Sequence, residues 1–291
     1  MNATAPHTTG TDLQPDLQPD LQPDLHPLDR ATRLVPQPDG TLHGHTDADY
    51  ANQVGPFGGV TAATLLKAAL DHPQRLGDPI ALTVNYAGPV ADGAFTVVAT
   101  PLRTNRSTQH WWLALQQGDE TVTTATAVFA QRRETWTATE VARPAAPAPD
   151  TLPRAQYSQV ARWIDRYDLR FVRGALFGAP ADGSEPDSVS TLWLRDDPPR
   201  PLDFVALASI CDAFFPRILI RRPKRVPFGT VSITTHFHAD TALLQAQGTA
   251  HVLGTARAQH FGRGFHDQSA EVWGADGALL ATSHQICYFK E

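Results

Sequence analysis

The sequence predicts an α+β fold in which one unit, a long apolar helix followed by an antiparallel sheet, occurs twice. Three observations predict this. The chain has 291 residues, enough for two units of ordinary size. An Ala/Pro run at residues 142–149 divides the folded part nearly in half, and the same order of patterns is found on each side of it. A curved sheet can wrap around a single helix, so each helix is expected to be apolar on nearly every side.

The chain is expected to begin with a disordered extension at residues 1–30. Residues 13–24 repeat the tetrapeptide LQPD three times, and a proline at every fourth position prevents a stable helix. The segment also has too little apolar surface to fold alone. We place the first unit at residues 31–140, a semi-rigid linker at 141–160 and the second unit at 161–291.

The first unit is predicted to contain one helix and then four strands. Pro56 to Gly59 open a helix with the sequence VTAATLLKAALDH, which is rich in apolar helix formers. Alternating apolar and polar residues and a high β-branched content predict the strands IALTVNYAGPV, AFTVVATPLR, STQHWWLALQQ and ETVTTATAVFAQ. A turn at Gly118 and Asp119 joins the last two strands.

The second unit repeats this order. Asp203 is placed to cap a helix over residues 204–215, and Pro216 ends this helix because proline lacks the backbone N–H that a helix needs. The strands predicted after it are GTVSITTHFHA, LLQAQGTAHVLG, FGRGFHDQSAEVW and ALLATSHQICYF. A turn at residues 274–277 joins the last pair.

Composition and charge exclude several classes of function. The net charge is −6, and no block of lysine or arginine is long enough to follow a phosphate backbone, so nucleic acid is not an expected partner. No eighteen apolar residues run together and the N-terminus has no signal-peptide pattern, which indicates a cytoplasmic protein that does not span a membrane. Cys211 and Cys287 lack any CxxC or Cys/His spacing, so we expect neither a disulfide framework nor a structural zinc site.

Asp212 lies within the apolar stretch ASICDAFFPR and is the first candidate for chemistry. On a helix it shares a core-like face with Val205, Ala208, Ser209 and Phe215. Burial there disfavours the charged carboxylate and raises its pKa towards the range that a general base needs. The alternative interpretation is a structural carboxylate that is bonded to nearby backbone or to Arg217.

The repeat allows the two helices to be compared. Aligning Val60 with Val205 places Lys67 opposite Asp212, so the first unit carries a cation where the second carries a carboxylate. The two units are therefore not expected to be functionally equivalent.

Two strand residues could act together with Asp212. Gln285 is predicted on the inner face of the sheet, because it alternates with Ala281, Ser283, Cys287 and Phe289. A buried glutamine needs partners for both its carbonyl and its amide, so it either holds a water near an Asp or satisfies backbone groups. Thr230 belongs to a polar row that faces either solvent or a cleft, together with Ser232, Thr234, His236 and His238.

Taken in this order, the residues resemble the acyl-CoA thioesterase II type of double-hotdog enzyme. The matching pieces are CDAFFP, TVSITTHFH and DGALLATSHQ in the second unit and FGG in the first, and the likeness covers about residues 40–291. The resemblance implies a double hotdog fold, acyl-CoA as substrate, no cofactor and a homo-oligomer. In that family the matching Asp, Thr and Gln position and activate the hydrolytic water, which implies these roles for Asp212, Thr230 and Gln285.

Thioester hydrolysis needs a base for the water and donors for the oxyanion that develops. The resemblance makes Asp212 the base, and the backbone amides of Gly58 and Gly59 at a helix N-terminus are chemically suited to bind the oxyanion. The two glycines equally fit a tight turn that requires them for steric reasons. This mechanism needs neither a metal ion nor a covalent nucleophile.

Two other kinds of chemistry have weaker support. The pairs His43/His45 and His236/His238 each place two imidazoles on one face of a strand, but neither has a third metal ligand nearby in sequence. The sequence has no GxSxG motif, which argues against a serine hydrolase. A cysteine hydrolase is disfavoured because the adjacent carboxylate would oppose a Cys211 thiolate.

Two further alternatives also use acyl thioesters. A hotdog dehydratase of 3-hydroxyacyl thioesters would pair a helix Asp with a catalytic His, and His284 lies one position before Gln285. Such an enzyme would hydrate an enoyl thioester without releasing a thiol. A non-catalytic acyl-CoA binding module would bind tightly without turnover, and its binding would survive the change Asp212→Asn.

Overall fold

The first half contains the predicted helix and strands, preceded by short elements that the sequence patterns do not predict. The structure is a computed structural model that describes residues 25–157, 159–176, 187–222 and 224–291. The elements of this half are α1 (Pro27–Ala31), β1 (Val35–Pro36), β2 (Leu42–His45), the 3-10 helix η1 (Ala48–Tyr50), α2 (Gly58–Leu70), β3 (Asp78–Tyr86), β4 (Ala94–Thr104), β5 (Thr108–Gln117) and β6 (Glu120–Ala130).

The second half has the same plan, and two of its strands precede its main helix. No strand is predicted there from the sequence. The elements are the 3-10 helices η2 (Pro149–Thr151) and η3 (Arg162–Arg166), β7 (Tyr167–Arg173), β8 (Ser190–Asp196), α3 (Phe204–Ile210), α4 (Arg217–Arg221), β9 (Phe228–Phe237), α5 (Thr241–Gln247), β10 (Val252–Arg257), β11 (Phe261–Gly262), β12 (Phe265–Trp273) and β13 (Leu279–Phe289).

All these strands belong to one antiparallel sheet that runs through both halves. The hydrogen-bonded order is β1-β2-β4-β5-β6-β3 in the first half and β9-β13-β12-β10-β8-β7 in the second, with β11 paired to β12 beside this path. The two halves meet where β3 pairs with β9, and Thr83 Oγ1 lies 3.0 Å from Thr234 Oγ1 across this junction. Each half is therefore one helix-plus-sheet unit, which confirms the predicted α+β double hotdog fold.

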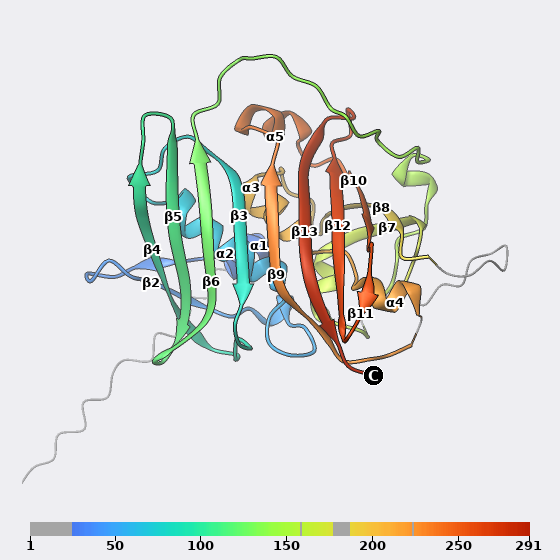
Figure 1. Cartoon of the computed structure of the whole chain (residues 1–291), viewed down its shortest axis with the longest axis horizontal. Helices are drawn as coiled ribbons and strands as arrows, with labels where there is room; N and C mark the ends of the chain where they lie inside the picture. Colours follow the sequence, from blue (N-terminus) through green and yellow to red (C-terminus); the bar gives the residue numbers. More distant parts are fainter. Residues whose placement is uncertain (1–24, 158, 177–186, 223) are drawn as a thin grey trace, which may run out of the picture.

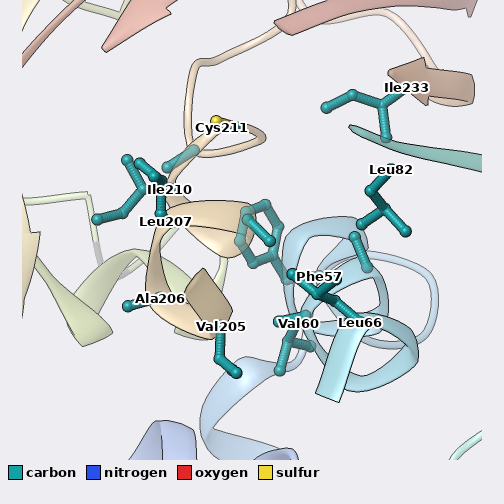
Figure 2. Close-up of a cluster of buried hydrophobic side chains, with 14 of the residues drawn as sticks. Phe57, Val60, Leu66, Leu82, Val205, Ala206, Leu207, Ile210, Cys211 and Ile233 are labelled. Carbon is teal, nitrogen blue, oxygen red and sulfur yellow. The ribbon is translucent and has the colours of Figure 1, made fainter. Parts of the chain in front are cut away.

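The helices α2 and α3 pack against each other on the inner side of the sheet. Of the 13 residues of α2 most are buried, and all 7 residues of α3 are. Figure 2 shows Phe57 and Val60 at the start of α2 close to α3, with Leu82 of β3 and Ile233 of β9 on the strand side of the cluster. The helices are apolar nearly all round, as predicted. Among the described residues no helix is both long and apolar enough to cross a membrane.

The linker between the halves crosses over one end of the sheet. In Figure 1 the chain leaves β6, passes above β3, β9 and β13, and reaches the side of the second half where β7 and β8 lie. Side-chain hydrogen bonds hold both ends of the crossing. Arg132 Nη2 donates to Phe237 O at 2.6 Å, and Trp193 Nε1 donates to Pro147 O at 2.8 Å.

The predicted strand over residues 243–254 is wrong in its first part. Residues Thr241–Gln247 form α5 and only the segment from Val252 onwards is a strand. The sequence TALLQAQ consists mostly of strong helix formers, and Asp240 caps the helix by accepting a hydrogen bond from Leu243 N–H at 2.8 Å. Gly248, with φ +58°, then ends it.

The expected N-terminal extension falls mainly on residues 1–24, which lie outside the described residues. The last part of the expected segment is helical, because α1 begins at Pro27. Leu28 of this helix is fully buried in the main core. The packed structure therefore includes residues on the N-terminal side of the boundary expected at residue 30.

Candidate active site

Asp212 lies in a turn after α3, so the predicted helix over residues 204–215 is too long. The helix ends at Ile210, and its last turn tightens, since Asp212 N–H donates to Ser209 O at 3.2 Å. Pro216 lies at the start of the next helix, α4, and cannot donate a hydrogen bond that would continue α3. Because the backbone leaves the helical path before Asp212, the carboxylate of this residue points towards α2.

The carboxylate of Asp212 lies against the N-terminus of α2, which belongs to the other half. The N-cap residue Phe57 makes no side-chain hydrogen bond to this helix, and the Gly59 N–H faces the Asp212 carboxylate and lowers its pKa. A Cβ atom on Gly58 would lie only 2.7 Å from Asp212 Oδ2, too close for a real Cβ contact. Glycine at this position thus allows a helix end of one half to touch a carboxylate of the other.

A β-bulge in β9 brings Thr230 to the inner face of the sheet. Thr230 and Ser232 pair with neighbouring residues of β13, so Val231 between them has no partner. The extra residue reverses the alternation of side chains at this point. The prediction that Thr230 shares a face with Ser232 and the polar residues after it is therefore wrong, and Thr230 lies beside Gln285.

The orientation of the Gln285 side chain is fixed by two donors. Its Oε1 accepts hydrogen bonds from Thr230 Oγ1 at 3.1 Å and from Cys287 Sγ at 3.4 Å. The amide Nε2 therefore points the other way, towards Asp212, and it is buried without a hydrogen-bond partner among the described residues. Gln285 lies on the buried face of β13, as its alternation predicts.

Burial is the main influence on the charge of Asp212. The residue is only 9% exposed, and burial raises the pKa of its carboxyl from 3.8 to about 7 although the Gln285 amide and the Gly59 N–H lower it. Near neutral pH the carboxyl therefore occurs both with and without its proton. Such a group can accept a proton from a water molecule that is held between it and Gln285 Nε2.

The interpretation that ties Asp212 to Arg217 is wrong. The guanidinium of Arg217 is fully buried and donates to Gln268 Oε1 and Ser190 Oγ, both at 2.9 Å, and to backbone carbonyls. Lys67, which the alignment of the two helices placed opposite Asp212, lies on the outer side of α2. It pairs with Asp71 at 2.6 Å.

His284 and the four paired histidines lie away from Asp212. His284 is on the exposed face of β13, where it lies 3.0 Å from Ser269 Oγ, so it cannot form the Asp–His pair of a dehydratase with Asp212. The His43/His45 and His236/His238 pairs are also exposed. Within the described parts of the chain, no three His, Cys, Asp or Glu residues lie close enough together to hold a metal ion.

Both cysteines are buried near the site and are held as thiols. Burial, with a smaller contribution from the charge of Asp212, raises the pKa of Cys211 to about 12 although a hydrogen bond to Thr235 lowers it. Burial likewise raises the pKa of Cys287 to about 12. Neither has the thiolate character of a nucleophile at neutral pH.

Tyr86 is a site residue that sequence reasoning missed. It ends β3, and its hydroxyl donates to Gly58 O at 2.7 Å. Burial and the charge of Asp212 raise its pKa well above the usual value for tyrosine, so it remains a neutral donor. Its place at the end of an ordinary strand, IALTVNY, gave no signal, because the contact depends on how β3 meets α2 in space.

Comparison with known proteins assigns both halves of the chain to domains of one kind. Residues 140–289 match the acyl-CoA thioesterase C-terminal domain, and residues 46–130 match the acyl-CoA thioesterase N-terminal domain. None of the curated proteins compared with the chain matches it.

Solved structures show the same fold over nearly the whole chain. A conserved protein of unknown function with a hot dog fold, from Alicyclobacillus acidocaldarius, is 48% identical with a TM-score of 0.88, and the match covers 92% of this chain and 99% of that one. A putative thioesterase II from Thermobifida fusca is 17% identical with a TM-score of 0.76, covering 92% and 99%. An acyl-CoA thioesterase II from Mycobacterium marinum is 19% identical with a TM-score of 0.73, covering 90% and 98%.

Proposed function

This chain belongs to the acyl-CoA thioesterase family, and from this premise we propose that it hydrolyses acyl-CoA to a free acid and CoA. One observation carries the proposal. A carboxyl with a pKa of about 7, Asp212, faces the unpaired amide of Gln285 at the N-terminus of a helix. For water to attack a thioester carbonyl, a site needs a base, a hydrogen-bond donor that can hold the water, and a partial positive charge.

In this mechanism Asp212 is the general base. A water molecule donates one hydrogen bond to the Asp212 carboxylate and accepts one from Gln285 Nε2, and its oxygen attacks the thioester carbonyl as its proton passes to Asp212. Thr230 positions the water indirectly, because its hydroxyl holds the Gln285 amide in the required orientation. The thiolate of CoA then leaves and takes up a proton from Asp212.

The two glycine amides have different roles in this proposal. The Gly59 N–H faces the Asp212 carboxylate and lowers its pKa, so it favours the ionised form of the base. The Gly58 N–H has no hydrogen-bond partner in the described part of the chain, and it lies at the positive end of α2. We assign it to the oxyanion that develops on the carbonyl oxygen.

The reaction class can be tested by supplying short, medium and long saturated acyl-CoAs and measuring the free thiol released. Turnover with thiol release supports hydrolysis. Hydration of an enoyl-CoA without thiol release, or tight acyl-CoA binding without turnover, would contradict it. The second and third outcomes identify the dehydratase and the binding module, respectively.

The activity should depend on pH through Asp212. Because the base must be ionised, kcat/KM should rise about tenfold per pH unit below pH 7 and level off above it, with a midpoint at about 7. Thiol release is measured across this range and corrected for spontaneous thioester hydrolysis. A profile with its midpoint near the usual carboxyl pKa of 3.8 would argue against Asp212 as the base.

Removing the Tyr86 hydroxyl should slow turnover moderately. The variant Tyr86→Phe loses the hydrogen bond to Gly58 O, which holds the first turn of α2 against Asp212. We expect kcat to fall about tenfold, the effect of one lost neutral hydrogen bond, with little change in KM. Tyr288→Phe, at an exposed position of β13, is the matched control. Equal kcat in the two variants would show that the Tyr86 hydroxyl does not contribute to turnover.

A further inference from the structure

A large cleft lies at one end of the second half. It has a volume of about 940 Å³ and lies between α4, the β11–β12 hairpin and the end of β13. Figure 1 shows these elements together at the lower right, beside the C-terminus. Each of them contributes an apolar side chain to the lining, namely Ile218, Phe261 and Phe289.

The charged side chains of this cleft are mostly cations. They are Arg221, Arg222, Lys224 and Arg263, with His260 beside them and Glu291 as the carboxylate. Glu291 already pairs with Arg222 at 2.6 Å, whereas Lys224 and Arg263 have no ion pair with any described residue. Since the whole chain has a net charge of −6, this positive surface is a local feature that would attract an anion.

Arg263 occupies a backbone conformation that arginine rarely adopts. It has φ +54° and is followed by Gly264 with φ +80°, in the two-residue loop between β11 and β12. Asparagine, aspartate and glycine are the residues that favour such a turn, because a larger side chain is strained there. A strained arginine at the edge of a cleft indicates that its guanidinium has a use there that offsets the strain.

A further cation, which is buried, directly precedes a lining residue of the cleft in the sequence. Arg217 begins α4, one residue before Ile218, and is fully buried. Its hydrogen bonds go only to neutral groups, among them Gln268 Oε1 and Ser190 Oγ, and no carboxylate within the described residues neutralises it. An uncompensated charge in a region of low dielectric adds to the positive potential of the nearby surface.

The cleft and the candidate active site lie on the same strand. Phe289 in the cleft follows Gln285 by four residues on β13, a separation of about 13 Å along an extended strand. An acyl-CoA has its thioester at one end of a pantetheine arm and its phosphates at the other. The arm, when extended, spans a distance of this order.

We propose that this cleft binds the phosphate groups of the nucleotide part of CoA, with Arg263 and Lys224 as the main contacts. The assignment rests on the proposed thioesterase function for its ligand. The Arg263 guanidinium donates paired hydrogen bonds to phosphate oxygens, and Lys224 supplies a second positive charge. The pantetheine arm then follows β13 towards Asp212 and Gln285, and the apolar side chains of the cleft contact the adenine.

Binding of CoA, measured by isothermal titration calorimetry without turnover, tests this proposal. Arg263→Gly removes the guanidinium and suits the positive φ, so the variant should fold with an unchanged or higher melting temperature. We expect its Kd for CoA to rise about tenfold, and that of Lys224→Gln to rise less, about threefold. The matched control is Arg106→Gly, an exposed arginine between β4 and β5, which should bind CoA as the wild type does.

Competition identifies the part of CoA that is bound. Adenosine 3′,5′-bisphosphate should displace CoA from the wild type, and inorganic phosphate at the same concentration should not. Unchanged CoA affinity in both cleft variants, or equal displacement by inorganic phosphate, would overturn the proposal. A protein that binds CoA through Arg263 but releases no thiol from acyl-CoA would contradict only the proposed hydrolysis. One that hydrolyses acyl-CoA with unaltered CoA affinity in both variants would contradict only the cleft assignment.

Discussion

The variant Asp212→Asn should lose about 10³-fold in kcat while remaining folded, the size of effect expected for removal of a general base. Asn has the shape of Asp and can still face the Gly59 N–H with its side-chain oxygen, but it cannot take a proton from water. Thiol release from acyl-CoA measures the loss. Asp119→Asn, an exposed carboxylate in the turn between β5 and β6, is the control and should keep full activity.

The stability of the same variant shows whether the role of Asp212 is catalytic or structural. Burial raises the pKa of Asp212 from 3.8 in the unfolded chain to about 7 in the folded one, so the folded state binds this proton more tightly. The free energy of unfolding of the wild type therefore falls as pH rises through this interval. The Asn variant escapes this loss, and its melting temperature relative to the wild type should be higher above pH 7 than near pH 4. A melting temperature well below that of the wild type above pH 7 would show that Asp212 stabilises the fold instead.

The second large effect is expected from a single methyl group at Gly58. In Gly58→Ala the new Cβ atom would lie 2.7 Å from Asp212 Oδ2 and 3.2 Å from the Tyr86 hydroxyl, so the carboxylate must move. A displacement of about 1 Å at a reacting group can cost about 10²-fold in rate, which is the fall in kcat that we expect. The control is Gly88→Ala, where the nearest atom to the new Cβ, Val122 Cγ1, is at 3.8 Å. Similar activities in the two variants would show that Gly58 is not part of the site.

The sequence allowed the repeated unit to be predicted, because burial of both helices and alternation of the strands leave regular patterns. It predicted α2 and the main strands of both halves, including β13 with Gln285 on its inner face. It failed for β7 and β8, which lie before the second helix. It also failed for α5, where the local helix preference of TALLQAQ outweighs the strand pattern that continues into β10.

The candidate site could be identified from the sequence only as a set of separate residues. Asp212, Thr230 and Gln285 were named, but the face assigned to Thr230 was wrong, because a bulge at Val231 has no signature in simple alternation. The contact between Asp212 and the start of α2 depends on how two distant helices pack. Tyr86 and the cleft around Arg263 depend in the same way on chain segments that meet only in the folded structure.

The α3 helix, unlike α2, is capped from within its own half: Asp203 accepts a hydrogen bond from Ala206 N–H at 2.8 Å. The helix end that would mirror the Asp212 contact is thus already satisfied, so the two repeats differ in what the N-terminus of each helix faces. In the proposed mechanism one repeat supplies the reactive side chains and the other supplies the helix end that receives them. Under the proposed mechanism, catalysis constrains both repeats but at different positions, so a substitution tolerated in one half need not be tolerated at the corresponding place in the other.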